Sequence, residues 1–422
     1  MRVARGLNFR YSNLSEVHWM DDGAGELFVP LHSCAGSTTI NLMSSEVAKA
    51  KGCEWFSAGN DMFPAMLGAI GAAGKSVDLE TYIFAPGPLG LRFVAALTKA
   101  VQRGVRVRVL VDALGSADLP GDYWHPLVAA GGEVRQFNPL ALRRFGIRNH
   151  RKLLVCDGNT AFLGGFNIAP EYEGDGVSSG WCDLGLRVEG ELVPALARSF
   201  EEMFSRAEFL HRRILPLRNF GARKMVLGDG SQLLLSGPGR VMNPIKRALR
   251  EDLAHAVNVQ IMAAYFLPSR RLRGDLAKVV HRGGTVEVML GGKSDVPLSR
   301  LAAQSLYRRM LSTGLRVLEY QPQVLHAKLI IIDGIIYVGS ANLDQRSLNI
   351  NYELLVRLQD PVEAARARQI FEERRKQCHE ITRDHWKRSW SLCGRLKQRW
   401  AYFLLVRIDP LVARWQLRGL PD

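Results

Sequence analysis

The sequence predicts an α/β fold of two α/β/α lobes that are related by internal duplication and share one site at their interface. Helical patterns alternate with short apolar runs through most of the chain, which is typical of α/β domains. Three landmarks also recur in one order, at offsets between 170 and 179 residues. The paired landmarks are Arg103-Gly104 and Arg282-Gly283, His150-Arg-Lys152 and His326-Ala-Lys328, and Asp183-Leu184 and Glu353-Leu354. Such a period indicates that one unit is present twice.

The apolar patterns predict the elements of the two lobes in a similar order. In the first lobe they predict a helix over 63–76, a strand over 77–84, a helix over 89–103 and a strand over 105–111. In the second lobe they predict a strand over 260–267, a helix over 272–282 and a strand over 286–290. The common order of strand, helix and strand supports the duplication.

The repeat divides the chain into four segments. We expect an N-terminal extension over 1–51, a first lobe over 52–215, a second lobe over 216–380, and a basic, Trp-rich amphipathic segment over 381–422. No apolar run reaches the roughly 18 residues that a membrane span needs. We therefore expect the protein not to cross a membrane, although it can lie on one.

The composition supports a folded core and limits the classes of binding partner that the protein favours. Of the 422 residues, 47% are hydrophobic and 23% charged, which excludes disorder as the dominant state. The 56 Lys and Arg exceed the 41 Asp and Glu, so the formal net charge is +15. Nucleic acid and anionic membranes are the partners that such an excess favours. The six cysteines form no CxxC pair, which indicates reduced thiols in a cytosolic protein rather than a zinc ribbon.

Each lobe contains the same hairpin pattern. Residues 150–167 read HRKLLVCDGNTAFLGGFN and residues 326–342 read HAKLIIIDGIIYVGSAN. An apolar strand, an Asp-Gly pair and a second apolar strand predict a hairpin. Because side chains two residues apart share one face of a strand, we expect the His and Lys of each copy to lie side by side.

The repeated His, Lys and Asn side chains suit a phosphate oxyanion. Lysine supplies charge, asparagine supplies a directed donor, and histidine can be a nucleophile or a general acid and base. Two half-sites that meet across a pseudo-twofold axis would place one histidine on each side of the phosphorus. That geometry suits in-line displacement through a phosphohistidine, with the lysines and asparagines in place of the metal that many such sites use. The predicted catalytic residues are His150, Lys152, Asn167, His326, Lys328 and Asn342.

Other residues of the motifs receive supporting roles. The aspartates of the Asp-Gly pairs, Asp157 and Asp333, lie about 23 Å along an extended strand from the histidines, so we assign them to the turn and to structural hydrogen bonds. The carboxylates that open later strands, Asp183 and Glu353, can fix the imidazole tautomers and support their charged form. The pairs that let the backbone approach a phosphate are Gly164-Gly165 and Gly339-Ser340.

With these motifs the sequence resembles the phospholipase D superfamily, whose signature is a pair of HxKxxxxD motifs followed by GGxN or GSxN. Three further segments resemble bacterial cardiolipin synthases of the short type, which lack N-terminal transmembrane helices. They are ETYIF at 80–84, RGVRVRVLVD at 103–112 and GSANLDQRSL at 339–348. The resemblance covers about residues 52–380, and it implies the bilobal fold and the phosphohistidine route.

The resemblance implies a phosphatidyltransferase. A phosphatidyl group would pass from one phosphatidylglycerol to a histidine, glycerol would leave, and the hydroxyl of a second phosphatidylglycerol would attack. The N-terminal histidine is usually the nucleophile in this superfamily, which assigns attack to His150 and acid–base work to His326. No cofactor or metal is implied. Another donor such as phosphatidylethanolamine, and hydrolysis to phosphatidic acid, stay open.

The C-terminal segment predicts contact with a membrane. Residues 366–422 hold 14 Lys and Arg against 6 Asp and Glu, so they carry just over half of the net charge. Three tryptophans, Trp386, Trp390 and Trp400, recur among the basic residues, as in an interfacial helix. We therefore expect peripheral association with anionic phospholipids such as phosphatidylglycerol, at the cytoplasmic face of a bacterial inner membrane. The alternative is a terminal helix that packs on the second lobe with ordinary solvated charges.

Two other functions compete with this interpretation. A phosphodiesterase or nuclease of the same superfamily would also suit the basic charge. A non-catalytic membrane scaffold would retain only an inactive remnant of the site. Intact HxK and Asn in both copies count against the scaffold. The Trp-rich tail and the segment at 339–348 count against the nuclease, so we expect no specific nucleic acid partner.

Overall fold

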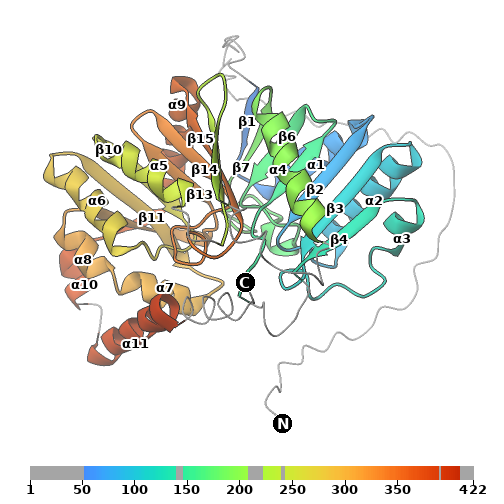
Figure 1. Cartoon of the computed structure of the whole chain (residues 1–422). Helices are drawn as coiled ribbons and strands as arrows, with labels where there is room; N and C mark the ends of the chain where they lie inside the picture. The colour runs from blue at the N-terminus through green and yellow to red at the C-terminus, as the bar shows by residue number, and fades with distance from the viewer. Residues whose placement is uncertain (1–51, 139–145, 208–221, 239–242, 389–390, 409–422) are drawn as a thin grey trace, which may run out of the picture. The chain divides into compact units, whose positions relative to one another are not determined.

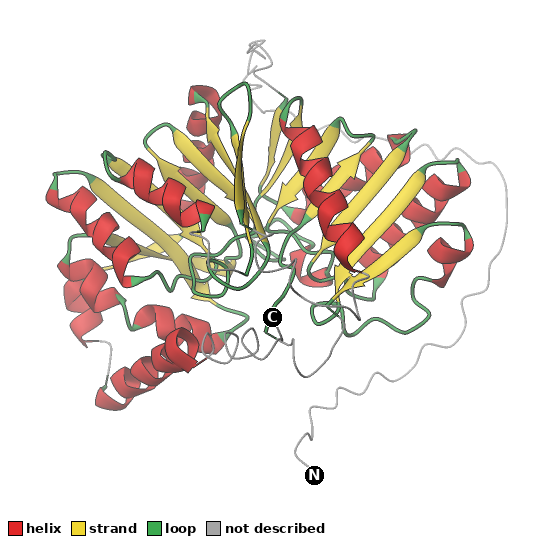
Figure 2. Ribbon diagram, viewed as in Figure 1, coloured by secondary structure: helices red, strands yellow, loops and turns green. Residues whose placement is uncertain are grey.

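A computed structural model describes residues 52–138, 146–207, 222–238, 243–388 and 391–408. The predicted extension over 1–51 and the end of the tail lie outside the described residues. The two predicted lobes appear as two mixed sheets, each with helices packed on its faces (Figures 1 and 2). Among the described helices, none is long and apolar enough to span a bilayer.

The first sheet has seven strands in the order β1-β7-β6-β5-β2-β3-β4. Strands β2, β3 and β4 run parallel, and the remaining neighbours pair antiparallel. The strands are β1 (Cys53–Phe56), β2 (Ser76–Thr81), β3 (Arg106–Asp112), β4 (Glu133–Phe137), β5 (Leu153–Cys156), β6 (Thr160–Gly164) and β7 (Gly185–Glu189).

The second sheet has nine strands in the order β16-β12-β11-β10-β13-β14-β15-β9-β8. Its central part repeats the first sheet, because parallel β10, β11 and β12 continue into the antiparallel β13, β14 and β15. The strands are β8 (Arg223–Val226), β9 (Gln232–Ser236), β10 (Asn258–Ala263), β11 (Thr285–Lys293), β12 (Arg316–Val324), β13 (Lys328–Ile332), β14 (Ile335–Gly339), β15 (Glu353–Gln359) and β16 (Cys378–Ile381). The shared strand order confirms the predicted α/β fold with an internal duplication.

Helices complete each lobe and join the two. Helices α1 and α2 pack on the first sheet, and α5 to α8 pack on the second. The largest hydrophobic cluster contains residues of α4, α9 and both sheets, so it forms a core shared by the lobes. The helices are α1 (Gly59–Ala72), α2 (Pro88–Gln102), α3 (His125–Ala129), α4 (Leu192–Ala207), α5 (Pro244–Leu253), α6 (Arg270–His281), α7 (Pro297–Gln304), α8 (Tyr307–Ser312), α9 (Pro361–Arg375), α10 (Arg383–Arg388) and α11 (Leu392–Phe403), with the short 3-10 helix η1 (Pro170–Tyr172) and the short π-helix η3 (Leu404–Ile408).

The Asp-Gly pairs form the two predicted hairpin turns. Asp157 and Asp333 adopt φ angles of 53° and 50°, in the left-handed region that a tight hairpin needs. The Asp157 carboxylate accepts the backbone N–H groups of 74–76, at 2.7 to 2.9 Å. The Asp333 carboxylate accepts those of 257–258. Each aspartate therefore ties its turn to the start of the neighbouring strand, β2 or β10.

The segments that carry the histidines differ from the prediction. His150 and Lys152 precede β5, and His326 precedes β13, so neither His-Lys pair lies within a regular strand. The reason is that these segments pair with the other lobe. The backbone N–H of His150 donates to the carbonyl of Tyr352 at 3.0 Å, and that of His326 donates to Cys182 at 2.7 Å.

The strands predicted over 77–84 and 260–267 are also shorter than expected. Strand β2 ends at Thr81 and β10 ends at Ala263. Beyond them Phe84 and Phe266 form only isolated bridges, to Ile168 and Leu343. The segments that follow β2 and β10 therefore leave their sheets at the edge where the histidines lie.

Candidate active site

The two histidines lie at the interface of the lobes, and each is bonded to a carboxylate of the other lobe. Nδ1 of His150 lies 3.1 Å from Oε2 of Glu353, and Nδ1 of His326 lies 2.6 Å from Oδ2 of Asp183. All four residues are at most 9% exposed. The sequence left this pairing open, and the structure shows that it crosses between the repeats.

The backbone explains the crossed pairing. Tyr352, whose carbonyl accepts from the backbone of His150, is directly followed by Glu353. Cys182, whose carbonyl accepts from the backbone of His326, is directly followed by Asp183. The same short bridges that join the lobes therefore bring each carboxylate to its imidazole.

The lysines lie beside their histidines, as the spacing predicts. Nζ of Lys152 donates to the carbonyl of His150 at 2.7 Å, and Nζ of Lys328 lies 2.7 Å from Nδ1 of His326. Burial, and then repulsion by Lys328, lower the pKa of Lys152 from 10.5 to about 7. Burial likewise lowers the pKa of Lys328, against the attraction of Asp183 and Glu353. Burial and mutual repulsion both disfavour the charged form of these lysines, and a bound anion would oppose both effects.

Both imidazoles are held towards the neutral form. Burial, with a contribution from Lys328, lowers the pKa of His326 from 6.5 to about 4, although Asp183 acts to raise it. Burial also lowers the pKa of His150, against the opposing effect of Glu353. Burial acts to raise the pKa of Glu353, but His150 and other partners lower it overall. A neutral imidazole beside an ionised carboxylate is the state that a nucleophile or base requires.

The two asparagines are buried but differ in their partners. Oδ1 of Asn167 accepts from the backbone of Ile83 at 3.1 Å, and its Nδ2 donates to the hydroxyl of Tyr172 at 2.7 Å. Oδ1 of Asn342 has no hydrogen-bond partner within the described part of the chain. The repeat therefore conserves the residue type but not its hydrogen bonds.

The Gly-Gly and Gly-Ser pairs contact the carboxylates of Asp183 and Glu353. A Cβ atom on Gly165 would lie 2.0 Å from Oδ1 of Asp183. At the matching position, Oγ of Ser340 donates to Oε2 of Glu353 at 2.6 Å. Gly164 and Gly339 adopt φ angles of 150° and 153° and approach the next strand closely. These contacts give the pairs a role that the sequence did not predict, beside the predicted approach to phosphate.

Aromatic side chains, to which the sequence assigned no role, surround the histidines. The rings of Tyr172, Trp181 and Tyr265 lie 5.3, 5.5 and 6.3 Å from that of His326, and the ring of Tyr82 lies 5.0 Å from that of His150. Of these, Tyr172 is fully buried, and its hydroxyl lies 3.4 Å from Nε2 of His326. Tyr172 follows Asn167 by five residues, whereas Ser347 follows Asn342 by five. An unduplicated residue gives no signal in a search for repeats.

A buried ionic network anchors the chain on both sides of His150. Nη2 of Arg151 lies 3.1 Å from Oε2 of Glu80, whose other oxygen accepts from Nδ2 of Asn149 at 2.7 Å. The residues on both sides of His326, by contrast, are apolar: Leu325 precedes it, Ala327 follows it, and both are buried. The two histidines are therefore held in place by different means.

The predicted membrane residues occupy different environments. The ring of Trp386 lies 4.8 Å from that of Tyr307 and packs against the core of the second lobe. Trp390 lies outside the described residues. Trp400 is 58% exposed. The structure thus gives Trp386 a packing position and leaves the ring of Trp400 open to solvent.

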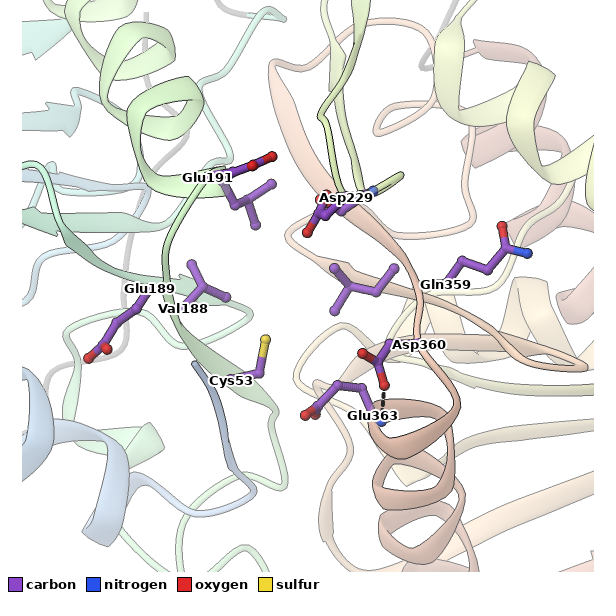
Figure 3. Close-up of a pocket in the computed structure, with 11 residues that line it drawn as sticks. Cys53, Val188, Glu189, Glu191, Asp229, Gln359, Asp360 and Glu363 are labelled. Carbon is purple, nitrogen blue, oxygen red and sulfur yellow. Dashed lines mark hydrogen bonds between the residues drawn. The ribbon is translucent and has the colours of Figure 1, made fainter. Parts of the chain in front are cut away.

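A separate small pocket is lined by none of these candidate catalytic side chains. Figure 3 shows that carboxylates gather around it, including Glu189, Glu191 and Asp229. Two more of its carboxylates have structural partners, since Asp360 caps α9 and Glu363 accepts from the indole N–H of Trp55 at 2.7 Å. An acidic lining repels phosphate, so this pocket is not the candidate site.

Comparison with solved structures supports the fold. A phosphatidylserine synthase from Haemophilus influenzae superposes with a TM-score of 0.69, over 86% of this chain and 95% of that one. The two sequences are 16% identical, so the likeness concerns the fold alone.

Comparison of sequences identifies relatives. Cardiolipin synthase B of Escherichia coli (strain K12) is 33% identical over 311 residues, which are 72% of this chain and 75% of that protein. A cardiolipin synthase of Oceanobacillus iheyensis is 35% identical over 72% of this chain. The match spans 64% of that relative, slightly less than two thirds of its length. Residues 66–206 and 249–375, more than half of the chain, match the family described as "Cardiolipin synthase, PLD-like domain". The chain therefore belongs to the family of cardiolipin synthase, PLD-like domain proteins.

Proposed function

We propose that this protein is a phosphatidyltransferase of the cardiolipin synthase type, which joins two phosphatidylglycerol molecules and releases glycerol. The observation that carries the proposal is the pair of crossed His–carboxylate contacts with a lysine beside each histidine. One imidazole from each lobe would flank a phosphodiester bound between them. The family of the chain and the names of its relatives support the lipid substrate.

The first step transfers the phosphatidyl group to His150. Glu353 occupies Nδ1 of this imidazole, so Nε2 is the atom that attacks the phosphorus. A P–N bond forms as the P–O bond to the glycerol headgroup breaks, and protonated His326 gives its proton to the leaving oxygen. A bound phosphodiester anion would raise the pKa of His326 and so supply that proton.

The second step restores the enzyme. The hydroxyl of a second phosphatidylglycerol attacks the phosphorus from the side that glycerol has left. His326, now neutral, takes the proton of that hydroxyl while the P–N bond to His150 breaks. One phosphodiester replaces another, so the exchange needs no nucleotide. Water in place of the second lipid would give phosphatidic acid.

The charge on the phosphate oxygens would be met by the chain itself. Lys152 and Lys328 are the buried cations of the site, and Asn342 has an amide that can be directed at the phosphate. We therefore propose catalysis without a metal ion. The same exchange in the presence and absence of a chelator tests this point, and a requirement for an added divalent cation would contradict it.

We also propose that the protein associates peripherally with anionic lipid at the cytoplasmic face of a bacterial membrane. The net charge of +15 supports this association. So does the exposed ring of Trp400 in a helix flanked by basic residues. The lipid substrate requires contact with a bilayer in any case.

The experiment supplies the purified protein with phosphatidylglycerol labelled in its glycerol headgroup, in mixed micelles with chelator. Cardiolipin and free labelled glycerol should appear together, and His326→Ala should abolish both. His281→Ala, an exposed histidine of α6, is the matched control and should leave both products unchanged. If the wild type releases no glycerol but cleaves single-stranded DNA, the proposed substrate is wrong.

A further inference from the structure

One surface of the second lobe gathers large apolar side chains that remain exposed. It combines the start of α7 with the outer face of α11 and η3. Its residues are between 38% and 58% exposed, and we call them the apolar platform: Val296, Leu298, Leu396, Trp400, Phe403 and Leu404. Figure 1 shows α7 and α11 side by side, and many contacts join them.

The platform is not the packing face of α11. The packing face is formed by Ala401, which is 1% exposed, and Tyr402 on α11, together with Leu405 and Val406 on η3, and these residues pack against the core of the second lobe. Helix α11 therefore buries one apolar face and still presents another. The packing of this terminal helix on its lobe, which was the alternative to membrane contact, accounts for the inner face only.

The charge around the platform is basic. Arg395, Lys397, Arg399 and Arg407 are all exposed, and residues 391–408 contain no acidic side chain. An indole and a phenyl ring among cations match the chemistry of an anionic lipid surface, where the rings enter the headgroup layer and the cations meet phosphates. A neutral or basic protein partner would not need these charges.

The platform begins next to the active site. Strands β10 and β11 are parallel, so the chain leaves both at the same edge of the sheet, where β13 begins and His326 lies. After β10, Tyr265 lies with its ring 6.3 Å from that of His326. After β11, Asp295 accepts from the hydroxyl of Tyr265 at 2.5 Å, and the next residue is Val296. Val296, the first residue of the apolar platform, therefore follows directly after Asp295, which is hydrogen-bonded to Tyr265 beside His326.

We infer that the apolar platform docks the protein onto an anionic bilayer, and that lipid substrate reaches the active site from the His326 side. The entry route rests on the proposed function. The docking itself rests on the exposed apolar residues and the basic charge. A membrane-bound platform would let a lipid move from the bilayer to the histidines without crossing water with its acyl chains exposed.

The first test measures docking. Trp400→Glu with Phe403→Glu, and separately Leu298→Glu on α7, should each weaken binding to vesicles of phosphatidylcholine and phosphatidylglycerol by about tenfold or more, since each removes apolar burial and adds repulsion. Leu91→Glu is the control, because Leu91 is also 58% exposed but lies on α2 of the first lobe. Pure phosphatidylcholine vesicles should bind the wild type more weakly.

The second test measures entry. Release of glycerol is followed with phosphatidylglycerol in vesicles and with a short-chain phosphatidylglycerol that is monomeric in water. The platform variants should lose activity on vesicles by about the same factor as binding, and should keep wild-type activity on the monomeric lipid.

The outcomes distinguish the docking proposal from the proposed enzymatic function. If the platform variants bind vesicles like the wild type, or if Leu91→Glu weakens binding equally, the docking surface is wrong. If the wild type is a dimer that Trp400→Glu dissociates while vesicle binding is unchanged, the platform is an interface between two copies, and the inference is also overturned. If the wild type acts on neither lipid but the variants still lose vesicle binding, docking holds and the proposed enzymatic function fails.

Discussion

At the scale of single residues, each histidine depends on a carboxylate of the other repeat. Glu353 is fully buried, and its Oε2 accepts from Ser340 while it faces Nδ1 of His150. We propose that a negative charge at this place fixes the tautomer that leaves Nε2 free and would stabilise the imidazole when it becomes cationic. The same reasoning applies to Asp183 and His326.

Glu353→Gln keeps the shape of the side chain and removes its charge. We expect kcat for glycerol release to fall by about 100-fold or more, with KM changed much less, because the loss concerns a charge that develops during the reaction. Ser340→Ala, which removes the hydroxyl that donates to Glu353 and also hydrogen-bonds the backbone of Leu354, should give a smaller loss. Equal kcat values for the wild type and Glu353→Gln would show that the carboxylate does not assist His150.

The buried His326 should make stability depend on pH. Its pKa is about 4 in the folded protein against 6.5 for an ordinary histidine, so the unfolded chain binds the additional proton. Its contribution to stability is therefore fully present above pH 6.5 and is lost as the pH falls towards 4. Urea unfolding at pH 7 and pH 5 should show a smaller difference for His326→Gln than for the wild type. An identical difference would contradict the burial of a neutral imidazole, and His281→Gln serves as the exposed control.

Tyr172 is expected to position the His326 half of the site. Its hydroxyl accepts from Asn167 and lies 3.4 Å from Nε2 of His326, and burial raises the pKa of this phenol well above 10, so it stays protonated. Tyr172→Phe should lower kcat by about tenfold and shift the pH profile, with the unfolding midpoint nearly retained. Tyr307→Phe, another buried tyrosine bonded to a carboxylate, is the control that should leave kcat unchanged. A matching pH profile in Tyr172→Phe and wild type would remove Tyr172 from catalysis.

The duplicated residues of the candidate site could be predicted from the sequence, whereas the residues that occur in one copy alone could not. The His, Lys, Asn and carboxylate positions occur twice, so each copy supports the interpretation of its counterpart. Tyr172 and Trp181 have no such counterpart, and an aromatic residue in a loop is usually explained by packing. The crossed pairing of the carboxylates was also beyond the sequence, because it depends on how the lobes meet.

At the scale of elements, the hairpins and their turns hold the site from a distance. The Asp157 turn is tied to the start of β2 by three hydrogen bonds, while the histidine lies at the other end of the strand. The predicted hairpins were confirmed because Asp-Gly has a strong local preference. The ends of the strands were mispredicted because contacts with the other repeat determine where the chain leaves the sheet.

Asp157→Ala separates structure from catalysis. It removes the acceptor of three backbone N–H groups and places alanine at a φ of 53°, so the free energy of unfolding should fall by about 1–3 kcal/mol. Activity per folded molecule should change by less than about twofold, because Asp157 and His150 lie at opposite ends of β5. The check is urea denaturation together with initial rates on the same samples. A large loss of kcat in a variant that remains as stable as the wild type would place Asp157 in the reaction.

At the scale of the whole molecule, the duplication brings two incomplete half-sites together in one candidate site. Each repeat provides a histidine, a lysine and the carboxylate that serves the opposite histidine. The α/β class and the repeat followed from periodicity and spacing in the sequence. The shared core of α4, α9 and both sheets did not, since apolar helix faces do not reveal which sheet they cover.

The net charge of +15 is also best considered at this scale. The basic residues of 391–408 alternate along the chain with the exposed apolar side chains of Leu396, Trp400, Phe403 and Leu404. The charge alone suits nucleic acid as well as lipid, whereas its combination with exposed Trp400 and Phe403 favours a bilayer. Membrane docking and catalysis would then take place on the same edge of the molecule.

The central claim is a covalent phosphatidyl-histidine formed between the two lobes, and rapid quenching tests it most directly. The protein is mixed with phosphatidylglycerol labelled in its phosphatidyl group and stopped with denaturant within one turnover, and protein-bound label is then mapped by peptide. We expect label on His150, stable in alkali and lost in acid, and none in His150→Ala. Formation of cardiolipin with no label on either His150 or His326 would contradict the account.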